Sequence, residues 1–309
     1  METGPGKPTY ESSLKARELD DPLDRFFYRK AAFPIAKVLR STRITPNMVT
    51  ILSIFVGVGG GVCFYFNSLI INLTGILLLI LANLLDCVDG QLARITGIKS
   101  RMGRILDGVA GNLWFIIIYF ALCFSMLRDG ITPWIFAAGA VAGFSNMVQS
   151  AMCDYFKNLN LLFLKGTAGS EMDDASMVIS KFKGYSWKDN FWQKLFFFFY
   201  RNYTVGQESV TPNIQRLKRS LGLEPGKQIP DSIRAFFNSR AKSAILFANF
   251  LTFNSRSMVL FPSVLLGVPW IYFIYEIIFL NISLAIALRK HEKLASAVQG
   301  MWMCPQMTG

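Results

Sequence analysis

Six long apolar segments constrain this chain more than any other feature. They are Asn47–Phe66, Leu69–Ala93, Ile105–Leu127, Ile131–Cys153, Ala244–Leu266 and Val268–Leu288. Each is long enough to cross about 30 Å of hydrocarbon as a helix that rises roughly 1.5 Å per residue. A chain of 309 residues, 52% of them hydrophobic, could not cover six such segments with other protein. We therefore expect an all-α integral membrane protein with six transmembrane helices.

The basic residues predict how these helices are oriented. All Lys and Arg residues except Arg128 and Arg256 lie before the first segment, between the second and third, between the fourth and fifth, or after the sixth. By the positive-inside rule, both termini and the long fourth loop are cytoplasmic, in a bacterial inner membrane or an internal membrane of a eukaryote. The net charge of +12 then faces anionic lipid head groups, and nucleic acid is not expected as a partner.

Composition changes along the chain predict four regions. Residues 1–43 are a cytoplasmic segment whose stretch Leu19–Arg43 mixes aromatic, aliphatic and basic residues, as an interfacial amphipathic helix does. Residues 44–154 carry four spans, 155–242 form a cytoplasmic loop, and 243–309 hold two spans and a basic tail. The loop contains an aromatic and basic stretch, Trp187–Tyr203, which we interpret as a second element lying on the membrane surface.

Two smaller patterns carry structural predictions. The small residues of Val56–Val62 (VGVGGGV) and Gly139–Gly143 (GAVAG) predict close packing between helices. The sole histidine, His291, lies in the basic run RKHEK and is interpreted as a solvated surface residue.

Three aspartates gather at the predicted cytoplasmic ends of the second and third spans. With about 100° of rotation per residue, Asp86 and Asp89 share one helix face with Gly90, Ala93 and Arg94. Gly103, Asp107 and Gly111 are spaced by four and form a stripe on the next helix. Side by side, the two stripes would form a pocket of three carboxylates, an arginine and a floor of small residues.

This pocket predicts a divalent metal ion and a phosphate ligand. Carboxylates at membrane depth are costly unless they pair or bind a cation, and ligands that are all oxygen favour Mg²⁺ or Mn²⁺. Arg94 can bind phosphate through two hydrogen bonds, while the small residues let a nucleotide approach the backbone. The structural alternative is a buried ion-pair cluster that joins two helices.

The pattern Asp86-x2-Asp89-Gly90-x2-Ala93-Arg94-x8-Gly103-x3-Asp107 resembles the signature of the CDP-alcohol phosphotransferases, integral membrane enzymes of phospholipid synthesis. The resemblance implies that an alcohol attacks the β-phosphorus of a CDP-linked donor and that CMP leaves. It also implies roles for residues that carry the pattern. Asp86, Asp89 and Asp107 would bind metal, Gly90, Ala93 and Gly103 would shape the cytidine pocket, Arg94 and Ser100 would hold the diphosphate, and Asn47 would contact the nucleotide.

The family pattern continues with an aspartate at position 111, which is thought to bind metal and accept the proton of the attacking hydroxyl. Here Gly111 and Asn112 occupy the end of the motif. On a regular helix Asn112 lies about 140° from Asp107, whereas Gly111 lies about 40° away. Three accounts remain open: a π-bulge that brings Asn112 to the metal, a substitute base such as Asp154, or a slow or inactive member of the family.

A second charged pair lies in the last two spans. Arg256 and Glu276 are placed to meet, either as an ion pair that holds the helical hairpin together or with Arg256 reaching toward a substrate phosphate.

The first functional hypothesis is an enzyme that uses CDP-diacylglycerol or a soluble CDP-alcohol as donor and an alcohol as acceptor. Its other expected partners are membrane lipids, and a homodimer is possible. The second is a non-catalytic protein of the same fold that binds a CDP-lipid or nucleotide. A transporter is disfavoured because no repeat is visible and the aspartates lie near helix ends.

Overall fold

The computed structural model describes residues 9–14, 19–98, 101–166, 172, 174–222 and 229–303, with the side chains of 101–110, 192 and 196 left out. Every regular element in these residues is helical. The chain divides into two compact units, one of Met1–Met147 with Thr252–Asn281 and one of Val148–Leu251 with Ile282–Gly309. The units are described separately below.

Six helical stretches are long and apolar enough to cross a membrane, which confirms the predicted fold class. They are Pro46–Cys63, Leu69–Thr96, Gly111–Arg128, Ile135–Lys165, Asp231–Leu265 and Trp270–Met303. Many of their apolar side chains face outward, as lipid contact requires. Phe55 is 72% exposed and Ile70 is 76% exposed, which a helix in water would not tolerate in such numbers.

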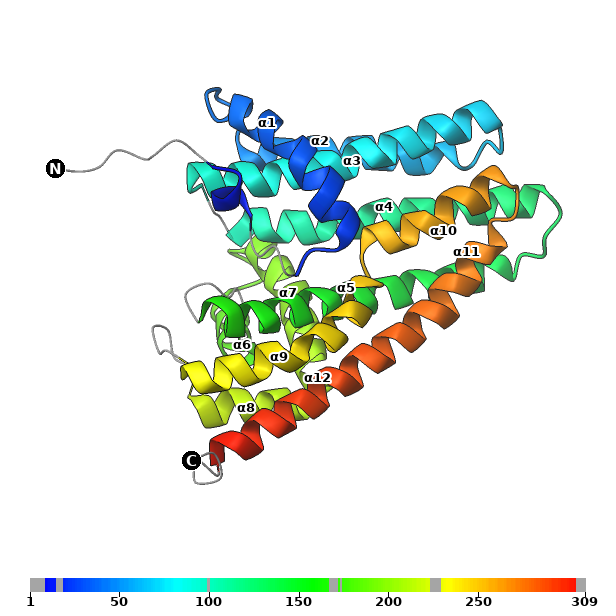
Figure 1. Cartoon of the computed structure of the whole chain (residues 1–309). Coiled ribbons are helices and arrows are strands. Elements are labelled where there is room, and N and C mark those ends of the chain that lie inside the picture. Colours follow the sequence, from blue (N-terminus) through cyan, green and yellow to red (C-terminus); the bar gives the residue numbers. More distant parts are fainter. Residues whose placement is uncertain are drawn as a thin grey trace. The chain divides into compact units, whose positions relative to one another are not determined.

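The first unit is built around a pair of tightly packed helices, α2 (Pro46–Cys63) and α3 (Leu69–Thr96), which lie side by side (Figure 1). Helix α2 begins where Thr45 accepts a hydrogen bond from the Met48 amide and Pro46 occupies the first turn. A Cβ on Gly60 would lie 2.9 Å from the Gly75 carbonyl oxygen, so the two backbones approach as closely as glycine allows. The predicted packing role of the Val56–Val62 glycines is confirmed for Gly57, Gly60 and Gly61, whereas Gly59 has no such atom closer than 4.0 Å.

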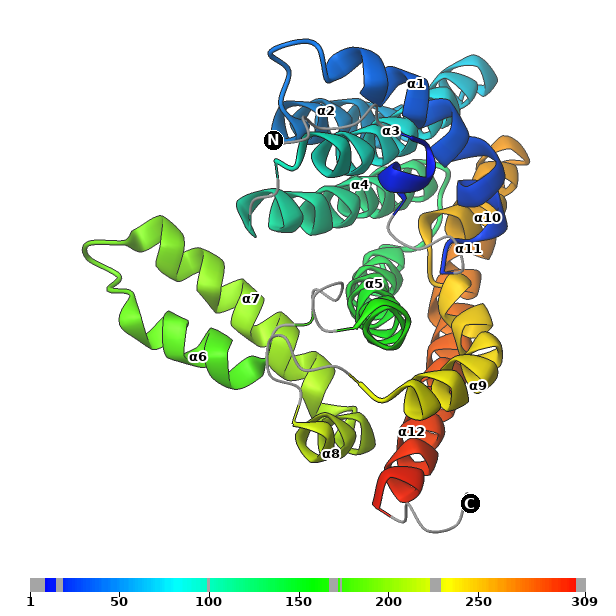
Figure 2. The same ribbon diagram turned by 60° about the vertical axis from the view of Figure 1, so that its left-hand side comes forward.

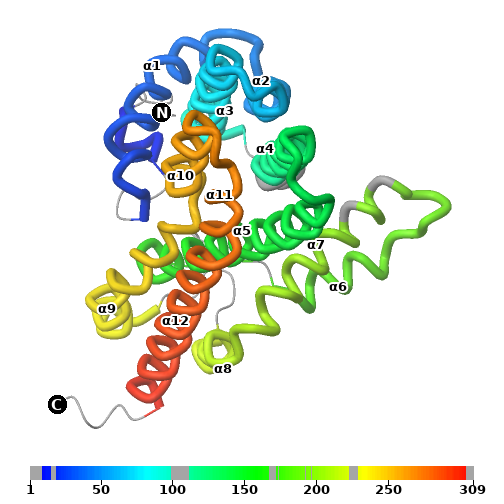
Figure 3. The backbone as a smooth tube through the Cα atoms, turned by 90° about the vertical axis from the view of Figure 1, so that its right-hand side faces the viewer, coloured from blue at the N-terminus to red at the C-terminus, as the bar shows by residue number. Residues whose placement is uncertain are grey.

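Helix α4 (Arg101–Arg128) packs on α2, and its C-terminal half joins the main hydrophobic core of the unit. The Trp114 ring fills the space beside Gly57, where an added Cβ would lie 2.4 Å from the indole nitrogen. Helix α10 (Phe253–Leu265) lies beside α11 (Trp270–Ile274) (Figure 3), and the π-helical turn η4 (Tyr275–Phe279) follows directly.

The expected N-terminal helix is present, as the π-helical turn η2 (Asp24–Tyr28) followed by α1 (Arg29–Leu39). Ala32 and Ala36 are fully buried against α3, whereas Phe26 and Val38 are 61% and 68% exposed. This two-sided character is that of an interfacial helix, and its position on a membrane stays a prediction. The start of the segment is anchored because Asn254 on α10 donates hydrogen bonds of 2.8 and 2.9 Å to the Asp21 carboxylate.

The second unit differs from the single surface element expected between residues 155 and 242. Helix α5 (Ile135–Lys165), whose last part lies in this unit, continues past Cys153. Three helices follow, α6 (Ala175–Gly184), α7 (Phe191–Ser209) and α8 (Pro212–Leu221), and α6 pairs with α7 as a hairpin (Figure 2).

The fifth span also differs from expectation. It starts at Asp231 instead of Ala244, and its helix is broken between α9 (Asp231–Asn249) and α10. The final helix, α12 (Leu280–Met303), runs on through the predicted basic tail. The break was not evident in the sequence because residues 250–252 (Phe-Leu-Thr) contain neither Gly nor Pro, the usual markers of a helix end.

Burial of His291 overturns its interpretation as a surface residue. Its side chain is fully buried, and its ring stacks on Phe156 with centroids 4.1 Å apart. Nδ1 lies 2.8 Å from the Ala287 carbonyl oxygen and Nε2 lies 3.1 Å from Asn160 Nδ2, so a neutral ring donating from Nδ1 satisfies both contacts. The neighbouring Arg289 and Lys293 are exposed, and the helical period turns position 291 inward between them.

Candidate active site

Helix α3 carries five of the predicted site residues along its last three turns. Asp86 is half-buried, and Asp89 is only 5% exposed. The helix is regular through Thr96 and ends at Gly97, whose φ of 72° is a left-handed conformation suited to glycine. Because no irregularity interrupts this stretch, the predicted common face of Asp86, Asp89, Gly90, Ala93 and Arg94 is retained. We call these five residues the motif face.

Gly90 and Arg94 lie against each other on this face. A Cβ at position 90 would stand 3.3 and 3.4 Å from the two terminal guanidinium nitrogens of Arg94. The glycine therefore lets the guanidinium lie flat across the helix surface. The Nε–H of Arg94 donates a hydrogen bond to the Ser13 carbonyl oxygen, which belongs to a short 3-10 turn, η1 (Glu11–Ser13).

The N-terminal segment supports the opposite side of the same helix. Buried Gln91 donates a hydrogen bond of 2.8 Å to the Arg29 carbonyl oxygen, and Tyr28 packs with Val88 and Leu92. The Arg29 guanidinium is held by Asp20 at 2.7 Å. Burial opposes the charged form of Arg29, but the Asp20 carboxylate and the nearby Asp24 and Cys87 together outweigh it and raise the pKa of the guanidinium.

Sequence analysis missed this support of the motif helix. Gln91 lies about 140° from Asp86, on the face that otherwise holds Val88, Leu92 and Ile95. An amide on an apolar face was the available signal, since buried amides require a partner. The contact between η1 and Arg94 had no local signal because it joins segments far apart in the chain.

The third predicted metal ligand lies on α4. Asp107 and Gly103 are in the helical backbone there, but their side chains are outside the described set, and Ser100 lies outside the described residues altogether. Among the side chains that are described, no three of His, Cys, Asp and Glu converge as a metal site. The donors that are described, Asp86 and Asp89, fit a hard divalent ion in chemistry, since both are carboxylates on adjacent turns of one face.

Position 111 is open. A Cβ built on Gly111 would meet no atom of the described residues within 4 Å, so these residues leave space for a side chain where the family pattern has an aspartate. Helix α4 is a continuous α-helix from Arg101 to Arg128, without a π turn. The π-bulge account is therefore wrong, and Asn112 keeps the facing of a regular helix, about 140° from Asp107.

The suggested substitute base lies in the second unit. Asp154 is exposed on α5, about three turns before the end of the helix. Its carboxylate accepts hydrogen bonds from Asn158 Nδ2 at 3.0 Å and from the Tyr203 hydroxyl at 3.2 Å. Desolvation, with the charge of Asp154 beside it, raises the pKa of Tyr203 well above its ordinary value. The Tyr203 phenol thus stays protonated and donates its hydrogen bond to the Asp154 carboxylate.

Two further predicted residues have contrasting surroundings. Asn47 is half-buried in the first turn of α2, within the unit that carries the motif face. Arg256 meets Glu276 as predicted, with Nε 3.3 Å from Oε1 and the two side chains 1% and 0% exposed. The Tyr272 hydroxyl donates to the other Glu276 oxygen at 3.1 Å, and the Arg256 guanidinium lies 5.5 Å from the centre of the Phe115 ring.

Together, six membrane-length helices and a carboxylate-bearing motif face on α3 define an integral membrane protein with a polar site built from helix residues. Comparison with known proteins makes the class specific. The family model "CDP-alcohol phosphatidyltransferase" matches residues 43–155, and this part of the chain is a CDP-alcohol phosphatidyltransferase domain. The match begins just before α2 and includes the whole motif.

Two curated relatives carry names from this family. Archaetidylinositol phosphate synthase of Pyrococcus horikoshii is 34% identical over 119 residues, which are 38% of this chain and 59% of the relative. CDP-diacylglycerol--glycerol-3-phosphate 3-phosphatidyltransferase of Cereibacter sphaeroides is 29% identical over 111 residues, which are 36% of this chain and 49% of the relative. The chain thus spans about half the length of the relatives it matches. The family is one of transferases and generally uses divalent metal ions.

Proposed function

We propose that this protein transfers a phosphatidyl or phospho-alcohol group from a CDP-linked donor to an alcohol acceptor in phospholipid synthesis. The observation that carries the proposal is the motif face of α3, which lies inside the matched domain. In the reaction, the acceptor oxygen forms a bond to the β-phosphorus, the bond to CMP breaks, and the acceptor's proton passes to a base. The relative named for CDP-diacylglycerol and glycerol 3-phosphate favours a lipid donor and a polar acceptor as the first pair to test.

In this proposal, Asp86, Asp89 and Asp107 hold a divalent ion, Mg²⁺ or Mn²⁺. Such an ion neutralises the diphosphate and stabilises CMP as a leaving group. Arg94 adds a planar pair of donors to the diphosphate, and its position across Gly90 keeps the guanidinium at the surface of the helix. Gly90, Ala93 and Gly103 leave room for cytidine, while Ser100 and Asn47 contact the diphosphate and nucleotide.

Proton removal is the step for which the motif supplies no group. Gly111 has no side chain, and the amide of Asn112 cannot accept a proton at neutral pH. Two accounts remain in the proposal: Asp154 acts as the base, or turnover is slow because no carboxylate assists it. Losing a general base typically costs about 10²–10⁴-fold in rate and leaves substrate binding intact.

A second candidate function follows from the same observation. A protein with a complete CDP-binding face and an empty position 111 could bind a CDP-lipid or nucleotide without catalysing transfer. In that case the motif face would bind CDP in a metal-dependent way, and no CMP would be produced from any donor.

Release of CMP separates the two candidates. Purified protein is incubated with Mg²⁺ or Mn²⁺, CDP-diacylglycerol and acceptors such as glycerol 3-phosphate or inositol phosphate, and in parallel with soluble CDP-alcohols and diacylglycerol. CMP above a blank without acceptor supports the transferase and identifies its donor class. If no pair yields CMP while CDP binding persists, the transferase is excluded and the binding protein is supported.

A further inference from the structure

The hairpin of α6 and α7 carries four aromatic side chains that keep a large part of their surface exposed. We propose that this face docks on an anionic lipid surface. The aromatic face consists of Trp187 in the turn and Phe191, Phe198 and Phe199 on α7. These side chains are 48%, 49%, 38% and 64% exposed, respectively. On α7, Phe198 and Phe199 lie within about 80° of Phe191, so the three share one side of the helix.

The interior of the hairpin is already filled. Val178 and Phe197 are buried at 3% and 9% exposure, and the ring of Phe197 stacks on Tyr185 with centroids 5.2 Å apart. Lys194 crosses between the two helices, where its Nζ donates a hydrogen bond of 2.6 Å to the Phe182 carbonyl oxygen. The ring of Phe198 also lies 6.4 Å from that of Phe182 on α6, yet the aromatic face keeps the exposed fractions given above.

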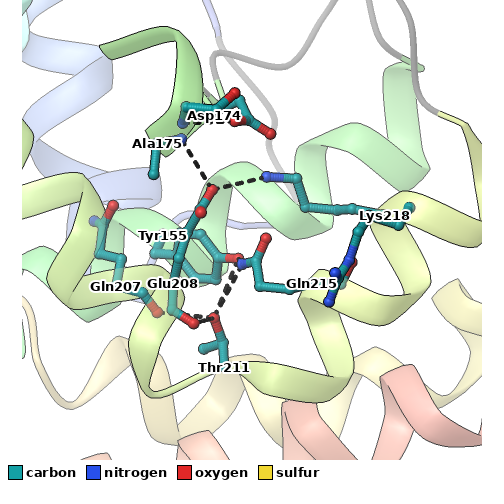
Figure 4. A network of polar contacts seen from close by, with 10 residues as sticks. Tyr155, Asp174, Ala175, Gln207, Glu208, Thr211, Gln215 and Lys218 are labelled. Atoms are coloured by element: carbon teal, nitrogen blue, oxygen red, sulfur yellow. Dashed lines mark hydrogen bonds and ion pairs between the residues drawn. The ribbon is translucent and has the colours of Figure 1, made fainter. Parts of the chain in front are cut away.

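The root of the hairpin is fixed by polar contacts, as Figure 4 shows. Glu208 at the end of α7 accepts from the Ala175 amide at the start of α6, at 3.2 Å, and from Lys218 Nζ at 3.4 Å. Gln215 on α8 donates a hydrogen bond of 2.6 Å to the Tyr155 hydroxyl on α5. Polar groups thus hold the end near α8, while exposed aromatic residues begin at the opposite end, where the turn lies (Figure 2).

Charge and composition favour lipid over protein as the occupant. Lys183 and Lys188 are exposed on and next to the turn, beside Trp187. Aromatic rings with lysines are the composition of membrane-interface elements, and lysines near a leaflet are attracted to anionic lipids. Protein interfaces also use aromatic residues but are depleted in lysine.

The connection to α5 keeps the hairpin within reach of a leaflet. Helix α5 is a membrane-length helix that ends at Lys165, and α6 starts at Ala175. A fully extended connection between them spans about 35 Å at most, at roughly 3.5 Å per residue. The start of α6 therefore cannot lie further than this from the end of a spanning helix.

Spin labels on the full chain in vesicles test the proposal. With the native cysteines replaced, a nitroxide is attached at Phe199→Cys or Trp187→Cys, and at Arg216→Cys, an exposed position on α8 that serves as the control. Collisions with oxygen, which partitions into lipid, are compared with collisions with a water-soluble nickel chelate. Vesicles are phosphatidylcholine with or without phosphatidylglycerol, and circular dichroism checks that each labelled chain is helical.

The proposal predicts that the labels at 199 and 187 favour oxygen in the vesicles with phosphatidylglycerol, whereas the label at 216 favours the nickel chelate. The paired charge reversal Lys183→Glu with Lys188→Glu should make the label at 199 more accessible to the nickel chelate. The substitution Arg219→Glu on α8 should leave that accessibility unchanged. A label at 199 that is as accessible to nickel as the one at 216 would overturn the proposal. So would shielding from both reagents, which indicates a protein contact, or a signal that is unchanged by the paired lysine reversal.

Discussion

In the proposed reaction, position 111 is the place where the family pattern has a general base and this chain has a glycine. Among the described residues, no atom lies within 4 Å of a Cβ placed at position 111, so none of them blocks the start of an aspartate side chain there. Since α4 is regular, the carboxylate would lie about 40° from Asp107 and could reach the same site. Glycine thus removes a functional group without reshaping the helix, and donor binding and proton removal can be studied separately.

We predict that Gly111→Asp raises the rate of CMP release by roughly 10²-fold or more, because it restores a general base. Gly111→Ala is the matched control, since it fills the same space without a carboxylate and should leave the rate unchanged. Single-turnover CMP release at saturating donor measures both.

The opposite result would point to Asp154. If Gly111→Asp has no effect while Asp154→Asn abolishes turnover, Asp154 is the base and the slow-member account is wrong. Tyr203→Phe then provides a further check, because it removes a hydrogen bond to Asp154 without altering its charge.

At the same scale, residue patterns explain what the sequence could and could not predict about the site. The motif face followed from helical period alone, because α3 is regular. The position of Arg94 against Ser13 and the burial of His291 did not follow, since each depends on segments more than eighty residues away. Basic neighbours made His291 resemble a surface residue, although the helical period placed it between them on the buried side.

Helices α2 and α3 approach each other closely at Gly60 and Gly75. An alanine at Gly60 would meet the Gly75 carbonyl oxygen at 2.9 Å and the Leu79 side chain at 3.0 Å, whereas at Gly59 the nearest such atom is 4.0 Å away. We predict that Gly60→Ala lowers stability by about 1–3 kcal/mol through overpacking.

Gly59→Ala on the same helix is the control and should be neutral or stabilising, because alanine favours helix over glycine by about 1 kcal/mol. Thermal unfolding in detergent, followed by circular dichroism, compares the two variants. Equal melting temperatures for the two variants would contradict the prediction, because they would show that α2 and α3 accommodate an alanine at position 60 without loss of stability.

The hairpin of α10 and η4 carries the buried Arg256–Glu276 pair. Glu276→Gln leaves the Arg256 guanidinium without its counter-charge. We predict that this variant lowers the free energy of unfolding by about 3–5 kcal/mol. The double variant Arg256→Met with Glu276→Leu should recover most of this loss, since two buried charges are removed together.

CMP release by the folded double variant then decides the role of Arg256. Retained release identifies the pair as a structural brace, while lost release with an intact fold supports substrate binding by Arg256. The sequence predicted the meeting of these residues from their depth in the two spans. It did not predict the π-helical turn that contains Glu276, because no residue type marks such a turn.

On the scale of the whole molecule, hydropathy predicted the six spans well because helix length and apolar composition are local properties. The second unit was predicted poorly. For the region that holds α6, α7, α8 and most of α9, composition predicted a loop with a single surface element. The packing of these helices depends on contacts such as the two hydrogen bonds from the Asn213 and Ile214 amides to Glu292.

Orientation in the membrane is the whole-molecule prediction. We expect a cysteine at Thr132, in the short exposed loop between α4 and α5, to react with a membrane-impermeant maleimide in intact cells or sealed right-side-out vesicles. A cysteine at Ser232, exposed in the first turn of α9, should react only after the membrane is opened. The reverse pattern would contradict the positive-inside assignment.

The most direct test of the account is metal-dependent binding of CDP, because it does not require the missing base. Calorimetry on purified protein should detect CDP binding with Mg²⁺ or Mn²⁺ that disappears with a chelator. Arg94→Ala should weaken binding by roughly 10- to 100-fold, the effect of about 1.5–3 kcal/mol for a charged hydrogen bond. Asp89→Asn should weaken it comparably, whereas Lys37→Ala, an exposed cation on α1, should have no effect. Binding that is indifferent to the metal, or unchanged in both motif variants, would contradict a CDP site on the motif face of α3.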